Sequence, residues 1–464
     1  MIARRAILQG GLVLPLAAAC TPEVLGGDSG AVRIAVSWSG NELTAFRVVL
    51  AGLASTGAFT GRVEVVPLGD DINTALSAGG RDAPDIVMLP DPGAIQTSAR
   101  TVLRALPELR AESIWQPDGR QVYSESWYNL LWHADCGRSP QLYGVPFKAA
   151  NMSLIWFDRS AFPGYDSRSC TSTGTDGPER WSLTDWGAYI EQFARSGRHL
   201  FALGAADGWV LAYHFANVLR AVAPRAYEAL SGPDVSAGEC WPPKRSGLPS
   251  PSWNHHHVRA ALTMLGKIWC VPGGFAGGVA QPLRRQFPDA IRDVFQHRRA
   301  AMVVAPDYAE PIVRDCLRRT GRPDCSVGVM GFPGYQAWND HPPNIGGGDV
   351  MVITADASPR AEDLVAALAA ANASQPWIAH YGGFVPPNLN TATPASYSGL
   401  FNGVADRMSR WDVFDFADLV GPRGRRDGLW RILTRFLIDV GDRGEQAVGP
   451  ATERAIGDLE RTWE

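Results

Sequence analysis

The chain of 464 residues lacks the surplus of positive charge that phosphate backbones demand of a nucleic-acid-binding protein. Its 43 Lys and Arg residues are outnumbered by 47 Asp and Glu residues, and the net charge is -4. Three catalytic signatures are also missing: the G-x-S-x-G elbow of serine hydrolases, the H-E-x-x-H zinc motif and the G-x-x-x-x-G-K-[ST] phosphate loop. We therefore expect no nucleic acid among its partners, and the absent motifs count against an enzyme.

Apart from an N-terminal stretch, no apolar run approaches the length of a membrane span, and neither internal repeats nor low-complexity tracts occur. What the chain does have is 45% hydrophobic residues and 16 Trp, enough for a large packed core, which excludes a disordered protein. Its length exceeds the roughly 250 to 300 residues at which single cores stop growing. Two domains or lobes are therefore expected.

The first 19 residues have the pattern of a bacterial export signal. Arg4 and Arg5 precede an apolar stretch that ends in small residues before Cys20. The small residues resemble a lipobox, in which Cys20 is acylated, although Ala17 stands where Leu is commonest. An ordinary cleaved signal is the alternative, and the paired arginines leave export by a twin-arginine route open. Residues 20–30 then form a Gly-containing tether.

Cysteine is scarce, with seven residues in the whole chain. Setting Cys20 aside leaves six, and an even number in an exported chain favours disulfides over a metal site or a catalytic thiol. Cys316 and Cys325 bracket a short polar loop and are the pair that we expect first. Nearness in the sequence suggests two more pairs, Cys136 with Cys170 and Cys240 with Cys270. The alternative is that several of the six are free buried thiols.

Short apolar strands alternate with amphipathic helices from residue 32 onward. Strands are expected at 32–36, 63–66 and 86–89, with a helix near 42–54 after the first of them. This alternation predicts an α/β fold with a mostly parallel, doubly wound sheet. In such sheets ligands bind outside the carboxyl ends of the strands, which directs attention to the loops at 37–42, 90–93 and 306–308.

Two clusters of polar residues suggest other chemistry. His255, His256 and His257 could suggest a metal site, but adjacent side chains on a helix or strand point in different directions, so none is expected. Several carboxylate pairs could act as a glycosidase acid and nucleophile if the fold brought them about 5 to 10 Å apart. These pairs are Asp70 with Asp71, Asp289 with Asp293, and Asp415 with Asp418; solvated faces or helix caps explain them equally well.

Aromatic residues occur at loop positions beside polar and flexible neighbours, notably Trp38, Trp209 and Tyr308. A sugar has apolar C–H faces and a rim of hydroxyls, so its pocket needs flat aromatic faces together with charged or amide side chains. For any single Trp, packing in the core is the alternative. Trp38 is the exception, because the sheet rule independently places it at a binding edge.

Several segments, taken in order along the chain, resemble the family 1 extracellular solute-binding proteins of ABC importers, the maltose-binding type. The resemblance covers the chain from about Val32 to its end, and each motif alone is weak. The segments, besides Cys20, are Ser37-Trp38-Ser39-Gly40-Asn41-Glu42-Leu43 with Phe46, Pro84-Asp85-Ile86-Val87-Met88-Leu89-Pro90-Asp91-Pro92-Gly93, Tyr143-Gly144-Val145-Pro146-Phe147-Lys148, Ala300-Ala301-Met302-Val303 and Gly346-Gly347-Gly348-Asp349.

The resemblance implies two doubly wound α/β lobes joined by crossing strands (the periplasmic-binding-protein-like fold, type II), with the solute in the cleft between them. We expect an export signal at 1–19, a lipidated Cys with tether at 20–30, the first lobe from 31–147 plus 300–346, and the second lobe from 148–299 plus 347–464. The implied ligand-binding residues are Trp38, Ser39, Asn41, Glu42, Asp91, Lys148, Tyr308, Gly348, Asp349 and Gly383, to which we add Asp207 and Trp209 from the second lobe. The segment after Gly208 lacks acidic and threonine positions found in relatives, which leaves the identity of the sugar open.

The sequence thus predicts a non-catalytic, lipid-anchored, monomeric binding protein without cofactor or metal, located on the outer face of the cytoplasmic membrane. It would capture a sugar, an oligosaccharide by preference, and deliver it by hinge closure to membrane permease subunits with a cytoplasmic ATPase. One alternative is the same scaffold serving a glycerophosphodiester or another polar solute. The other is a secreted hydrolase.

Overall fold

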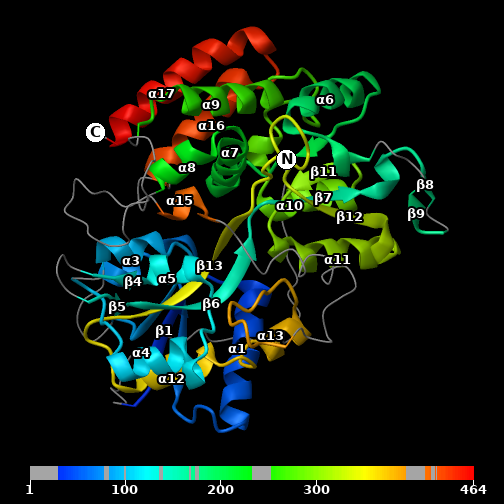
Figure 1. Ribbon diagram of the computed structural model, residues 1–464. Helices are drawn as coiled ribbons and strands as arrows, with labels where there is room; N and C mark the ends of the chain where they lie inside the picture. Colours follow the sequence, from blue (N-terminus) through cyan, green and yellow to red (C-terminus); the bar gives the residue numbers. More distant parts are fainter. Residues whose placement is uncertain are drawn as a thin grey trace, which may run out of the picture.

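The computed structural model describes residues 30–77, 83–98, 101–134, 139–166, 169–172, 177–231, 252–392, 413–419, 424 and 426–463. Helices surround two larger sheets, one in each half of the molecule (Figure 1), and two further sheets have two strands each. The strands are β1 Val32–Val36, β2 Val63–Pro67, β3 Ile86–Leu89, β4 Trp132–His133, β5 Gln141–Leu142, β6 Gly144–Asn151, β7 Leu154–Asp158, β8 Tyr165–Asp166, β9 Thr171–Ser172, β10 Phe201–Ala202, β11 Met302–Val304, β12 Val327–Gly331, β13 Ile345–Ile353 and β14 Val413–Phe414.

The helices around one of the larger sheets lie at the lower side of Figure 1, and the helices around the other lie at its upper side. The helices are α1 Gly40–Ser55, α2 Thr74–Ser77, α3 Gly93–Ser98, α4 Glu108–Trp115, α5 Glu125–Leu131, α6 Trp186–Arg195, α7 Gly208–Val222, α8 Pro224–Leu230, α9 His256–Trp269, α10 Phe287–Phe295, α11 Glu310–Thr320, α12 Arg360–Ala369, α13 Gln375–His380, α15 Phe416–Leu419, α16 Arg431–Val440 and α17 Val448–Trp463.

The first sheet confirms the predicted α/β unit at the start of the chain. Its order is β14-β13-β3-β1-β2, with β6 paired to β13, and both neighbours of β1 run parallel to it. The side chains of β3 are all buried, as expected of a strand covered by helices on both faces. Helix α1 directs Ala45, Phe46 and Val49 into the core beneath this sheet.

The second sheet is smaller and has the order β10-β11-β7-β12. Strand β7 is central and entirely buried, and it pairs antiparallel with both β11 and β12. Helices α7, α9, α16 and α17 pack against one another in this half, and α10 and α11 also pair. The two-lobed architecture predicted from the sequence is therefore present.

The predicted assignment of segments to lobes is wrong for β11 and β12 and for the stretch from β13 to α13, whereas α16 and α17 lie in the second lobe as expected. Residues 300–346 were expected in the first lobe, but β11 and β12 pair with β7 and belong to the second sheet. Residues 347–464 were expected in the second lobe, but β13 pairs with β3 and β6, and α13 packs against α1. Backbone pairing with strands far back in the chain decides which lobe a segment joins.

Three connections join the lobes. The first leads from β6 to β7 through residues 152–153, the second from β12 to β13 through 332–344, and the third from β14 to α15 through Asp415. At the third, the Asp415 N–H donates to the Gly346 carbonyl of the first sheet at 2.8 Å, while Phe416 packs among Tyr227 and Trp253 of the second lobe. The long strands β6 and β13 lie alongside each other at this junction (Figure 1).

The expected disulfide between Cys316 and Cys325 is also wrong, because Cys325 pairs with Cys170. Cys316 lies on the buried face of α11 and Cys270 is buried as well, and both are free thiols. Nearness in the sequence therefore misled us, since a helix directs Cys316 into the core. The other expected pairs, Cys136 with Cys170 and Cys240 with Cys270, are excluded by the same assignments. Cys20, Cys136 and Cys240 lie outside the described residues.

Candidate functional site

Five polar or charged side chains meet where the two lobes join, and we call them the interlobe cluster: Glu42, Lys148, Asp307, Tyr308 and Asp349. Glu42 lies in the first turn of α1, which follows β1, and Asp307 and Tyr308 follow β11 in a short 3-10 turn. Lys148 and Asp349 are opposite each other on β6 and β13. The loops after β1 and β11 are among those that the sheet rule selected from the sequence.

A buried ion pair forms the centre of the cluster. The Lys148 Nζ lies 2.8 Å from Glu42 Oε1, and the Lys148 side chain is 5% exposed against 31% for Glu42. Removing an ammonium group from water carries a penalty of several kcal/mol unless opposite charges surround it. Burial would lower the pKa of Lys148, but Glu42, Asp349 and Asp307 together raise it, so the side chain stays charged.

The two aspartates of the cluster have perturbed acidities. Burial raises the pKa of Asp307 to about 7, against hydrogen bonds from the backbone and the charge of Lys148, which both lower it. Burial also raises the pKa of Asp349 to about 7, opposed by Lys148 and by a side-chain hydrogen bond from Trp38. Both carboxyls therefore titrate near neutral pH, where each can donate as well as accept a hydrogen bond.

Aromatic rings surround the ammonium group from both lobes. Lys148 Nζ lies 5.3 Å from the ring centre of Tyr308 in the second lobe and 5.2 Å from that of Trp377 in the first. Tyr308 in turn neighbours Trp209, which begins α7, and Phe287, with ring centres 6.3 Å and 5.6 Å away. Trp209 and Tyr308 are only half-buried, so part of each ring is open to a ligand.

Asp307 links the cluster to the first crossing connection. Its Oδ2 accepts the Asn151 N–H at 2.9 Å, at the end of β6, while its Oδ1 is buried and has no hydrogen-bond partner among the described residues. A buried carboxyl oxygen without a partner is costly, and a ligand hydroxyl or a water would satisfy it. The Asp307 carboxyl thus holds the first connection through Oδ2 and can accept a hydrogen bond from a ligand through Oδ1.

Two glycines bring the backbone close to the cluster. Gly348 has φ of 145°, and a Cβ there would lie 2.1 Å from the Lys148 carbonyl oxygen, next to the register shift between Asp349 and Val350. Gly383 has φ of 59°, and its Cβ would lie 3.2 Å from the Tyr308 Cα. Both glycines thus allow close backbone approach, and their predicted contact with a ligand stays a prediction.

Trp38 does not offer the open stacking face that we expected of it. Its side chain is 5% exposed, and its ring packs edge-on against Phe46 and Trp377 at 5.1 Å and 4.9 Å, and at a tilt against Phe147. The indole also lowers the pKa of Asp349 through a hydrogen bond. In this arrangement Trp38 supports the cluster from the core of the first lobe.

The other predicted residues have different surroundings. Asp207 accepts the Phe287 N–H at 2.6 Å and so fixes the start of α10 to the start of α7. Asp91 is buried and accepts from the Asn73 amide at 3.1 Å. Ser39 and Asn41 are exposed on the loop before α1 and in its first turn. Ser39 and Asn41 remain predicted ligand contacts, although none of the contacts described for them reaches the interlobe cluster.

Sequence reasoning missed several residues at the junction. Asp307 precedes the predicted Tyr308, and the sheet rule selects that loop, so it could have been named. Trp377 and Arg314 gave no signal, because each lies within a helix of ordinary pattern. The Arg314 Nη2 donates to the Tyr381 carbonyl oxygen at 2.6 Å, and its Nε lies 2.7 Å from Glu310 Oε1, so it ties α11 of the second lobe to the loop after α13 of the first.

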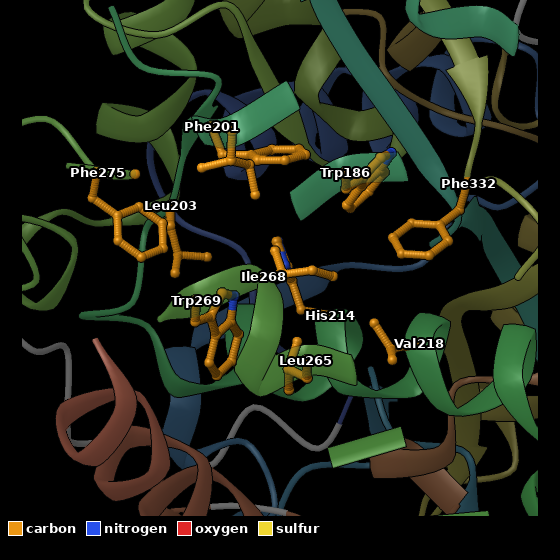
Figure 2. A pocket seen from close by; sticks show the side chains of 12 residues that line it. Trp186, Phe201, Leu203, His214, Val218, Leu265, Ile268, Trp269, Phe275 and Phe332 are labelled. Carbon is orange, nitrogen blue, oxygen red and sulfur yellow. The ribbon is translucent and has the colours of Figure 1, made fainter. Parts of the chain in front are cut away.

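Two hollows lie away from the interlobe cluster among the described residues. Figure 2 shows an apolar void inside the second lobe, where Trp186, Phe201 and Trp269 surround His214. Its volume of about 10 Å³ has room for one water at most. Burial lowers the pKa of His214 to about 3, so the imidazole stays neutral in this void. A larger, open hollow of about 380 Å³ lies on the outer side of the first lobe, beside Arg110 and Arg360.

Comparison with known proteins identifies the architecture. No family model matches the chain. The osmoprotective compounds-binding protein GgtB of Synechocystis sp. is 22% identical over 395 residues, which cover 82% of this chain and 80% of that protein. The structure of the bacterial solute receptor AcbH, described with an exclusive preference for β-D-galactopyranose, aligns with a TM-score of 0.69 at 12% identity, covering 94% of this chain and 99% of AcbH.

A third similar structure is the maltose-bound MalE3 of T. maritima, with a TM-score of 0.63 at 15% identity over 93% of this chain and 99% of that one. At these identities the likeness establishes the fold. The chain has the two-lobed fold of AcbH, MalE3 and the raffinose-bound RafE, and the fold predicted from the sequence is confirmed.

Proposed function

We propose that this protein is the solute-binding component of an ABC importer and that it captures a neutral sugar between its lobes. The single observation that carries the proposal is the interlobe cluster, in which charged and aromatic groups of both lobes converge on Lys148. Carboxyl and ammonium groups match sugar hydroxyls, and half-buried rings match the apolar sugar faces. Receptors of this fold with sugar ligands support the same conclusion.

The charge of the cluster favours a neutral sugar over a phosphodiester. Lys148 is paired with Glu42, and Asp307 and Asp349 add further negative charge when ionised. Bidentate guanidinium groups, which phosphate recognition favours, do not occur in the cluster. An anionic solute would thus meet repulsion without compensation.

The mechanism that we propose is hinge closure about the three connections. A ligand that contacts both lobes binds the closed form better and shifts the population toward it. The closed form would then be presented to the permease, and no chemical step is required of the chain. We further propose export, with acylation of Cys20 as the anchor and a monomeric state. Among the described residues, no helix combines the length and the apolar character that a membrane crossing needs.

The test is a ligand panel on residues 21–464. Thermal unfolding is followed with mono-, di- and oligosaccharides, glycerophosphodiesters and amino acids. A ligand at 100 times its dissociation constant adds about 2.7 kcal/mol, so a true solute raises the midpoint by several degrees. A shift with one class of sugar supports the proposal, whereas a shift with phosphodiesters alone contradicts it.

A matched pair of tryptophan variants connects binding to the site. Trp209→Ala removes a half-buried ring at the junction, and we expect sugar affinity to fall about tenfold or more, equivalent to about 1.4 kcal/mol. Trp338→Ala removes a ring that is 51% exposed in the connection between β12 and β13, where the Gly334 and Tyr335 carbonyls accept hydrogen bonds from the second lobe, and should leave the affinity unchanged. Equal effects in calorimetric titrations would place the ligand elsewhere.

A further inference from the structure

Three consecutive histidines at the start of α9 come together in a way that their spacing did not predict. His255 is the residue before the helix and has extended backbone angles, φ of -68° and ψ of 139°, whereas His256 and His257 are the first helical residues. The change of backbone direction at His255 brings its ring back over the other two. The ring centres lie 4.3 Å, 4.9 Å and 4.0 Å apart, for the pairs 255–256, 255–257 and 256–257.

The ligand atoms of the three imidazoles lie within 4.8 Å of one another. In a tetrahedral zinc site, imidazole nitrogens stand about 2.1 Å from the ion and therefore about 3.4 Å from each other. His256 and His257 are exposed, so rotation of their side chains can close the remaining difference without moving the helix. The reason given from the sequence for excluding a metal, divergent side chains, does not apply here.

Neighbouring groups do not block the position. The nearby cation, Arg259, donates to Glu453 Oε1 and to Asn254 Oδ1, both at 2.9 Å, so two of its N–H groups are engaged away from the rings. The His255 Nδ1 accepts the His257 N–H at 3.3 Å. Coordination through that nitrogen would release the N–H to water, a small loss at an exposed site.

We propose that His255, His256 and His257 form a surface site for one divalent transition-metal ion of the class that imidazole prefers, Zn²⁺, Cu²⁺ or Ni²⁺, with water completing its coordination. The site lies on the second lobe and is separate from the interlobe cluster. The proposal does not depend on the solute that the protein binds.

The experiment is titration of residues 21–464, prepared without a polyhistidine tag, with Zn²⁺ by isothermal calorimetry. We expect one ion per chain in the original protein. The variants His256→Ala and His257→Ala should each weaken binding about tenfold or more, and the double variant should abolish it. His297→Ala, which removes an exposed histidine outside the cluster, is the matched control and should bind Zn²⁺ like the original protein.

A spectroscopic readout identifies the ligands directly. Cu²⁺ added at one equivalent should show hyperfine coupling to imidazole nitrogens in electron paramagnetic resonance, and the double variant should lose it. Circular dichroism confirms that each variant is folded. Absence of Zn²⁺ binding, or binding that the double variant retains, overturns the proposal.

Discussion

Lys148 combines three roles in one side chain. Its ammonium group neutralises Glu42, lowers the pKa of Asp307 and Asp349 against the effect of their burial, and faces a ring from each lobe. A lysine this deeply buried is rare unless it is paired. Because the same charge serves the fold and the proposed ligand, stability and affinity should change together when it is removed.

The variant Lys148→Met tests this dependence. Removing one member of a buried pair leaves the other uncompensated, so we expect a loss of about 3 kcal/mol in the free energy of unfolding, together with loss of sugar binding. Lys267→Met breaks an exposed pair with Glu445, whose side chains are 50% and 75% exposed, and should cost less than about 1 kcal/mol. Urea unfolding measures both, and similar losses would show that burial of the first pair is unimportant.

Asp307 and Asp349 predict an unusual pH dependence of stability. Burial raises the pKa of each to about 7 in the folded protein, from an ordinary value of 3.8. The folded state therefore holds more protons than the unfolded state between these values, and stability falls as pH rises through this interval, by up to about 1.4 kcal/mol per unit for each carboxyl. Above pH 7 the loss is complete.

Urea unfolding at pH 5 and pH 8 measures this effect. We expect the original protein to lose more stability between the two than the variants Asp307→Asn and Asp349→Asn, which cannot ionise at these positions. If the variants lose as much as the original, the two carboxyls are not the groups that titrate.

Among single residues, position in the fold could be predicted from the sequence, whereas exposure could not. Glu42, Lys148, Tyr308 and Asp349 were named because strand ends and family motifs mark them, and all four lie in the interlobe cluster; their contact with a ligand stays a prediction. Trp38 was also named, but its ring is buried, since Phe46 and Trp377 cover it from elements that the sequence does not bring together. No single-residue pattern shows whether a ring ends in the core or at a surface.

At the scale of elements, the pairing of β6 with β13 shapes the site. Gly348 allows β13 to approach the Lys148 carbonyl. The register shift that follows it separates the part of β13 that pairs with β6 and β14 from the part that pairs with β6 and β3. Irregularities of this kind aim side chains at functional sites. Here Asp349 is the side chain that faces Lys148.

The variant Gly348→Ala tests this role. A Cβ would meet the Lys148 carbonyl oxygen at 2.1 Å, and φ of 145° is unfavourable for alanine, so we expect a loss of about 3 kcal/mol or more in stability. Gly331→Ala, at the end of β12, meets no atom within 4 Å and should change stability by less than about 0.5 kcal/mol. Chemical denaturation curves distinguish the two, and equal midpoints would contradict the argument.

The strands at the start of the chain were predicted closely, since β1 has the expected bounds and α1 differs by a few residues. Local periodicity is sufficient there because the bounds of a strand or helix depend mainly on the residues within it, whichever strand becomes its partner. The cysteines illustrate the opposite case. Cys170 and Cys325 are 155 residues apart, and only tertiary packing brings them together.

At the scale of the whole molecule, Arg314 makes one of the contacts that hold the lobes against each other near the cluster. It lies on α11 of the second lobe and donates to the Tyr381 carbonyl of the first. Removing it should loosen the junction, so we expect Arg314→Ala to have a larger radius of gyration in small-angle X-ray scattering. Arg319→Ala, on the same helix but paired only with Asp315 in the described contacts, serves as control. Identical scattering from both variants would show that the contact does not restrain the lobes.

The lobe boundaries escaped sequence reasoning because neither the polar, Pro-containing residues 332–344 nor Asp415 differs in pattern from an ordinary surface loop. Residues 332–344 and Asp415 lie between apolar elements in both directions, and each strand joins its sheet through backbone hydrogen bonds that any sequence can make. Predicting such boundaries requires knowing which distant strand is the partner.

The three connections have a consequence for how the protein is made. The first sheet needs β13 and β14, and the second lobe needs α16 and α17, so neither half has its full set of elements until translation is nearly finished. Strand pairings between residues so far apart in the sequence form slowly. Until the partner strand has been synthesised, the unpaired strand edges are prone to aggregate. The emerging chain should therefore depend on chaperones through most of its synthesis, and neither lobe should be obtainable as a contiguous, independently folding fragment.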